Sequence, residues 1–89
     1  MIIKFSNHSK IQMLARGANE KEVIETISEG VWMTARENKF HCTKTFSFHN
    51  ISPINKQFYM YKTIDSIFVN EISEIYVITV KVYYHNDRN

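Results

Sequence analysis

The side chains of this sequence that are best suited to acid–base chemistry are histidines with lysines near them. His41 and His49 fall in a stretch where polar and apolar residues alternate, and two later stretches contribute Lys62 and Lys81. An imidazole can donate or accept a proton near neutral pH, and a neighbouring lysine could assist it. At the rise of a strand His41 and His49 are roughly 25 Å apart, so they cannot act together on one substrate atom. Each histidine could equally be a solvated surface residue.

A second polar pattern is a stripe at helical spacing near the start of the chain. His8, Gln12 and Arg16 stand four residues apart, so they share one face of a helix. In one interpretation His8 acts as a base or binds a ligand together with Arg16. In the other interpretation the stripe is structural: His8 ties the helix start to a sheet, and Arg16 pairs across that sheet.

Aromatic residues interleave with lysines in the second half of the chain. Rings beside positive charge can stack nucleic-acid bases along a charged channel for the backbone. The same rings could instead form the core and the cross-strand pairs of a sheet. The residues concerned are Phe58, Tyr59, Tyr61, Tyr76, Tyr83 and Tyr84, with Lys62 and Lys81 among them.

Composition excludes several classes of protein. The 89 residues fit a single domain, and a hydrophobic content of 44% argues against disorder. Cys42 is the only cysteine, which excludes an internal disulfide and a cysteine-based zinc site. No carboxylate accompanies the histidines at chelating spacing and no nucleotide-binding loop is present, so we expect neither a metal nor a cofactor. Without a membrane-length apolar run or a signal peptide, a cytoplasmic protein is expected.

Two short helices are predicted over residues 6–30. In the first, Ile11, Leu14 and Ala15 form an apolar stripe that is expected to be buried, and Gly17 suits the left-handed position that ends a helix. The pair should therefore cover one face of a sheet.

The second helix is predicted to begin at Asn19, with Glu22 at the spacing of a capping box, and to end at Gly30. Its outer face is acidic and it is short, which argues against a DNA-reading helix-turn-helix. The residues expected on its buried face are Val23, Ile24 and Ile27.

After residue 30 the apolar period changes to two, which predicts strands. The last strand is long and rich in β-branched and aromatic residues, so it is expected at the centre of the sheet. Its expected apolar face is formed by Tyr76, Ile78, Val80, Val82 and Tyr84. The predicted strands are Ile2–Phe5, Val31–Arg36, Phe40–His49, Phe58–Ile64, its continuation Ile67–Asn70 after a bend at Asp65-Ser66, and Ile75–Tyr84.

The predicted fold class is α+β with the order β-α-α-β-β-β-β. Two short N-terminal helices pack on one face of a mainly antiparallel sheet, and the other face stays open.

Short motifs give the chain a resemblance to a known family. His8, Met13, Arg16-Gly17 and the second helix after them resemble the start of a small, widespread bacterial domain of unknown function, which carries an H…RM…RG signature. That family ends its sheet in a "viTv" strand, which Ile78-Thr79-Val80 matches. Its layout is similar to that of RelE- and BrnT-type toxins.

The resemblance implies a function on the open face of the sheet. RelE-like toxins cut messenger RNA by using basic residues there, without a metal. Carried over by position, the implied catalytic residues are Arg36, His41, Lys62 and Lys81, and the implied binding residues are His8 and Arg16.

The family usually has a further arginine where this chain has Gln12, which weakens a phosphate-binding role for the first helix. The implied partners are RNA or an antitoxin-like protein. The alternative function is a non-catalytic module that dimerises or binds a protein through a sheet edge or an aromatic surface. Fold alone does not decide between an endoribonuclease and such a module.

Overall fold

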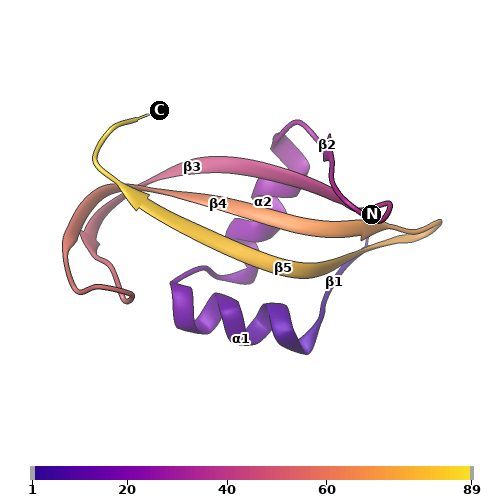
Figure 1. Ribbon diagram of the computed structural model, residues 1–89, viewed down its shortest axis with the longest axis horizontal. Coiled ribbons are helices and arrows are strands. Elements are labelled where there is room, and N and C mark those ends of the chain that lie inside the picture. The colour runs from indigo at the N-terminus through magenta and orange to yellow at the C-terminus, as the bar shows by residue number, and fades with distance from the viewer. Residues whose placement is uncertain (1, 89) are drawn as a thin grey trace.

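In the computed structural model, which describes residues 2–88, two helices pack on one face of a mixed five-stranded sheet (Figure 1). The sheet order is β1-β5-β4-β3-β2, in which β1 is parallel to β5 and the other neighbours are antiparallel. The predicted order β-α-α-β-β-β-β is confirmed. The elements are β1 Ile2–Phe5, α1 Asn7–Arg16, α2 Glu20–Glu29, β2 Met33–Thr34, β3 Phe40–Ile51, β4 Phe58–Asn70 and β5 Glu74–His85.

The central strand is β4, and β5 lies between β4 and β1. The prediction that the last strand is central is therefore wrong. β1 is only four residues long and pairs with residues 74–77 of β5, so among the described residues no strand covers the outer edge of β5 beyond that point. In Figure 1, β3, β4 and β5 form the long layer, and α2 crosses behind β3 and β4.

Helix α1 begins and ends as its sequence predicts but buries a different face. Ser6 accepts a hydrogen bond from the Ser9 amide at the start, and Gly17 ends the helix with a φ of 85°. Ile11 and Leu14 are 68% and 87% exposed, so the prediction that their stripe is buried is wrong. Met13 is the large apolar side chain that α1 buries.

The rotation of α1 is explained by the edge of β5. The Val80 amide donates to Gln12 Oε1 at 2.9 Å, and Arg16 Nη1 donates to Val80 O at 2.8 Å. Unpaired backbone groups at a sheet edge need partners when they are shielded from water, so these two bonds turn the polar stripe inward. The apolar residues Ile11 and Leu14 then face outward.

Helix α2 follows its prediction closely. Asn19 and Glu22 form the predicted capping box, with each side chain accepting from the other residue's amide. Val23 and Ile27 are buried, and Thr26 joins them because its hydroxyl donates to the Glu22 carbonyl inside the helix. Ile24 is 39% exposed.

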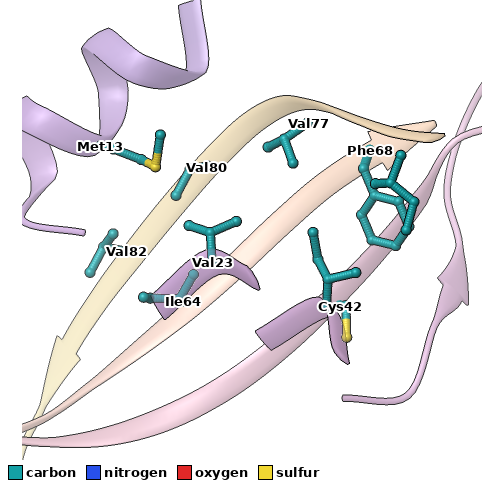
Figure 2. Packing of buried hydrophobic residues seen from close by; sticks show 10 residues of the cluster. Met13, Val23, Cys42, Ile64, Phe68, Val77, Val80 and Val82 are labelled. Atoms are coloured by element: carbon teal, nitrogen blue, oxygen red, sulfur yellow. The ribbon is translucent and has the colours of Figure 1, made fainter. Parts of the chain in front are cut away.

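The core lies between the helices and the sheet (Figure 2). Met13 of α1 and Val23 of α2 face Ile64 of β4 and Val80 of β5. Trp32 closes one end by packing edge-on against Phe68 and by donating from its indole to the Ile27 carbonyl. The buried hydrophobic residues are Met13, Val23, Ile27, Cys42, Ile64, Phe68, Ile75, Val77, Val80 and Val82.

A bulge in β5 changes which side chains face the core. Ile67 pairs with Thr79 but Phe68 pairs with Val77, so Ile78 is the extra residue. Before the bulge Ile75 and Val77 are buried and Tyr76 is exposed, which corrects the expectation that Tyr76 and Ile78 belong to the apolar face. The later residues Val80 and Val82 face the core as predicted.

Three predicted boundaries also change. β4 runs unbroken through Asp65 and Ser66, so the expected bend there is wrong. β2 keeps only Met33–Thr34 of the predicted strand 31–36, and β5 continues through His85, one residue beyond its predicted end at Tyr84. Each helix has ten residues, and in the part of the chain that the structure describes no helix is long and apolar enough to cross a membrane.

Candidate functional site

The face of the sheet opposite the helices carries polar side chains in cross-strand rows. Strand alternation puts these residues outward while Cys42, Ile64 and Val80 face the core. Each row takes one residue from each of β3, β4 and β5. The rows are His41, Ile67 and Thr79; Thr43, Asp65 and Lys81; Thr45, Thr63 and Tyr83; and Ser47, Tyr61 and His85.

His41 and Asp65 form the one histidine–carboxylate pair among residues 2–88. The Nδ1 atom of His41 lies 3.3 Å from Asp65 Oδ1, and the two side chains are 30% and 16% exposed. A carboxylate that accepts from Nδ1 fixes the orientation and tautomer of the ring and leaves Nε2 to exchange a proton. This is the arrangement that a general base or acid requires.

Two predicted cations lie beside this pair. Lys81 pairs with Asp65 across β5 and β4, and its side chain is exposed. No ion pair of Lys81 forms within the described residues. Arg36 lines a pocket of about 280 Å³ at the adjacent end of the face, together with Ile67 and Thr79. We call His41, Asp65, Lys81 and Arg36 the His41 group.

Lys62 does not belong to this group, because it lies on the opposite face of the sheet. It has the same strand parity as Ile64, and its Nζ donates to Gly17 O at 2.8 Å and contacts Glu22 Oε2 at 2.9 Å. Only 8% of its side chain is exposed. The expectation that Lys62 acts on the open face is therefore wrong, and its role is to tie both helices to β4.

His8 and Arg16 also face away from the open surface. His8 is exposed at the start of α1, and its Nε2 lies 2.9 Å from the Gln12 amide nitrogen. Arg16 is held by its bond to the Val80 carbonyl. The structural interpretation of the stripe therefore fits the contacts better than the binding one, although Gln12 rather than His8 makes the bond to the sheet.

The Arg16-Gly17 corner is fixed by Tyr84. The Tyr84 hydroxyl donates to the Arg16 carbonyl at 2.6 Å, and a Cβ on Gly17 would collide with that hydroxyl and approach Pro53 Cγ to 2.9 Å. Burial, and secondarily the charge of Glu22, raise the pKa of Tyr84 above its ordinary value. A protonated phenol is what this hydrogen bond requires.

The acidic helix and the basic strands neutralise each other. Lys44 of β3 contacts Glu29 at 2.9 Å and Glu25 at 3.7 Å, and its pKa is raised chiefly by the hydrogen bond with Glu29. Together with the contact between Lys62 and Glu22, these ion pairs neutralise Lys44 and Lys62 on the helix-covered side. Near His41 on the open face, Lys39 pairs with Glu37 at 3.5 Å, whereas Lys81 and Arg36 form no ion pair among residues 2–88.

Cys42 offers no accessible nucleophile. Its thiol is buried, donates to the Thr26 carbonyl, and lies against Gly30. Burial, followed by the negative charge of Asp65, raises the pKa of the thiol, so it stays protonated and unreactive. Within residues 2–88 no three His, Cys, Asp or Glu side chains are grouped so that they could hold a metal ion.

The sequence did not identify Asp65 as a site residue. A bend was expected at Asp65-Ser66, which hid the alternation that puts Tyr61, Thr63 and Asp65 on one face of β4. The alternation is regular in the burial of β4 but not in its sequence, because Lys62 and Ser66 stand on the core-facing side and Ile67 stands on the outer side.

Comparison with known proteins adds no assignment to this geometry. Neither a model of a protein family, nor a curated protein, nor a solved structure matches this chain.

Proposed function

We propose that this protein binds single-stranded RNA across the open face of its sheet and cleaves it at the His41 group without a metal. The observation that carries the proposal is the His41–Asp65 pair on the face opposite the helices, with Lys81, which forms no ion pair among residues 2–88, across from Asp65. The chain resembles in its motifs a bacterial domain family whose layout is similar to that of RelE- and BrnT-type toxins, and this similarity of layout supports the same surface and the same class of substrate.

The residues can be assigned to the steps of a transphosphorylation. His41 Nε2 takes the proton of the ribose 2′-hydroxyl, while Asp65 holds the ring and stabilises the imidazolium. The 2′-oxygen attacks the phosphorus, and the bond from phosphorus to the 5′-oxygen breaks. The leaving oxygen takes a proton from the Lys81 ammonium, and both groups then regain their starting state by exchange with water. The products are a 2′,3′-cyclic phosphate and a 5′-hydroxyl.

Charge on the phosphate is balanced by the cations of the group. Lys81 lies in the row of Asp65, and Arg36 lines a pocket with Ile67 and Thr79 of the adjacent row, which also contains His41. Fixed positive groups that face the position of a developing oxyanion lower its energy. Arg36 therefore stabilises the phosphorane oxygens.

The test is cleavage of a short single-stranded RNA in buffer that contains a chelator, with the DNA of the same sequence as a control. We expect the 2′,3′-cyclic product from RNA and no cleavage of DNA, which lacks the attacking hydroxyl. His41→Ala should reduce cleavage about 100-fold or more. Added imidazole should restore part of the activity, which a merely structural histidine would not permit.

Unchanged cleavage by a folded His41→Ala variant would contradict the assignment of His41. Equal cleavage of DNA would contradict the transphosphorylation itself. RNA binding without any cleavage would show that the protein binds RNA and would contradict the catalytic part of the proposal.

A second candidate function is a protein-interaction module, and one observation favours it. The outer face of α1 exposes Ile11 and Leu14, which are 68% and 87% accessible. An apolar pair of this kind on a helix can contact a second copy of the chain or an antitoxin-like protein. Leu14→Glu should then abolish self-association measured by light scattering. A wild-type protein that is monomeric in the same measurement would contradict the homodimer.

A further inference from the structure

A second group of side chains gathers on the open face at the opposite end from the His41 group. The Tyr61 ring stacks on His85 with centroids 5.9 Å apart and an interplanar angle of 27°. His49 meets the Tyr61 ring edge-on at 6.5 Å, and the guanidinium carbon of Arg88 lies 5.8 Å from the ring centroid. We call these four residues the tyrosine–histidine cluster.

A bulge in β3 places His49 in the cluster. Ser47 pairs with Tyr61 but Asn50 pairs with Tyr59, so two residues of β3 stand opposite one residue of β4. His49 takes a positive φ of 49° there, a conformation that is uncommon for a residue other than glycine. Bulges of this kind re-aim a side chain, and here the side chain turns toward Tyr61.

The His85 ring is held at both of its nitrogens. Its Nε2 lies 2.8 Å from the Thr63 hydroxyl, which is itself 2.8 Å from the Thr45 hydroxyl. Its Nδ1 bonds the carbonyl of Asp87. A ring fixed in this way is a preorganised stacking surface, because little conformational freedom remains to be lost when a ligand binds.

The chemistry of the cluster suits a nucleobase. Every base has a π-face that stacks on aromatic rings, and a nearby guanidinium can stack on the same base or contact the adjoining phosphate. His49 and Arg88 are exposed, whereas Tyr61 and His85 are half-buried, so the half-buried rings form the floor and the exposed groups form the rim.

We propose that the tyrosine–histidine cluster seats one base of a single-stranded RNA and so selects which phosphate lies at the His41 group. This inference rests on the proposed function. Tyr61 stands four residues from Asp65 along β4, which is roughly 13 Å at the rise of a strand. The seated base therefore belongs to a nucleotide beyond the cleaved linkage.

The test uses short single-stranded RNAs with 2′-O-methyl groups, which cannot be cleaved, each with 2-aminopurine at one position. Stacking quenches the fluorescence of this base, so we expect quenching at one position of the series when the protein binds. Tyr61→Leu should abolish that quenching and weaken binding about 10-fold or more, while Tyr61→Phe keeps both. Tyr76→Leu is the matched control, because Tyr76 is a partly exposed tyrosine near the other end of β5.

A second readout tests the choice of phosphate on cleavable RNA. Wild-type protein should cut at a fixed distance from a preferred base, and Tyr61→Leu should cut at several phosphates. Quenching that survives in Tyr61→Leu, or that is lost equally in Tyr76→Leu, would overturn the inference while His41-dependent cleavage continued. If the wild-type protein bound no RNA at all, the proposed function and this inference would fail together.

Discussion

Lys62 and Lys81 stand on neighbouring strands of one sheet but on opposite faces, and their surroundings differ accordingly. Lys62 is 8% exposed at its side chain and binds Glu22 and the Gly17 carbonyl. Lys81 is exposed and has no ion pair among the described residues, although Asp65 is its cross-strand neighbour. A buried charge is stable only when fixed partners in the protein compensate it, whereas an exposed charge without such partners can bind a ligand.

The same contrast separates the two sets of polar residues. Gln12, Arg16 and Tyr84 all bond backbone groups, so on the helix-covered side hydrogen bonds hold α1 against β5. On the open face His41 and Asp65 bond each other and leave Nε2 of the ring available. Gln12 and Arg16 of α1 thus maintain the fold, and the candidate chemistry lies on the other side of the sheet.

The largest expected effect comes from the same substitution made on the two faces. Lys62→Met should lower the free energy of unfolding by about 2–3 kcal/mol, because it leaves Glu22 and the Gly17 carbonyl without their partner. That loss is below the range for a fully buried pair since Glu22 remains 21% exposed. Lys81→Met should change stability by less than about 0.5 kcal/mol. Urea unfolding of both variants measures the two changes in the free energy of unfolding. Equal decreases in the two variants would contradict the difference between the two faces.

A smaller effect is expected at the neighbouring tyrosines Tyr84 and Tyr83. Tyr84→Phe removes the hydrogen bond to the Arg16 carbonyl and should cost about 1 kcal/mol at neutral pH. Tyr83→Phe, on the exposed face, should cost almost nothing.

The same pair predicts a pH dependence. Burial raises the folded-state pKa of Tyr84 above that of a free tyrosine, so its contribution to stability is intact below the free value and is lost as the pH rises through the raised value. Cys42 acts in the same direction, because burial raises the pKa of its thiol. Unfolding curves of the wild type should therefore shift to lower denaturant concentration in alkali, and Tyr84→Phe should shift less than Tyr83→Phe. Parallel shifts in the two variants would contradict the role of Tyr84.

The smallest expected effect tests the orientation of α1. Leu14→Ala should change the free energy of unfolding by less than about 0.5 kcal/mol, because Leu14 is 87% exposed. If Leu14 lay in the core, as its position in the apolar stripe predicts, the loss would be about 2–5 kcal/mol. Thermal unfolding of this variant beside Met13→Ala, which removes a buried side chain of the same helix, distinguishes the two orientations.

The sequence predicted the elements of the fold because most of its signals are local. The capping box at Asn19, the left-handed end at Gly17 and the alternation in β3 depend on neighbouring residues, and the structure has all three. The rotation of α1 was not predictable in this way. It is set by Gln12 and Arg16 bonding Val80, which is more than 60 residues away along the chain.

The candidate site was predictable in part for the same reason. Alternation predicted the faces of His41 and Lys81 correctly. It did not predict the face of Lys62, because the core-facing positions of β4 mix Lys62 and Ser66 with apolar residues. Asp65 was missed because a polar Asp-Ser pair suggests a bend, whereas strands on both sides of β4 keep that segment extended.

The proposed function requires that RNA contacts the open face of the sheet and not the helix-covered face. The most direct measurement is an NMR titration of backbone amides with a short 2′-O-methyl RNA at low salt. We expect shifts at His41, Asp65 and Lys81, and at Tyr61 and His85 near the other end of the face, which weaken as salt is added. The amide chemical shifts of residues in α1 and α2 should not change. Shifts confined to the helices, or no shifts at any RNA concentration, would contradict the assignment of the open face as the functional surface.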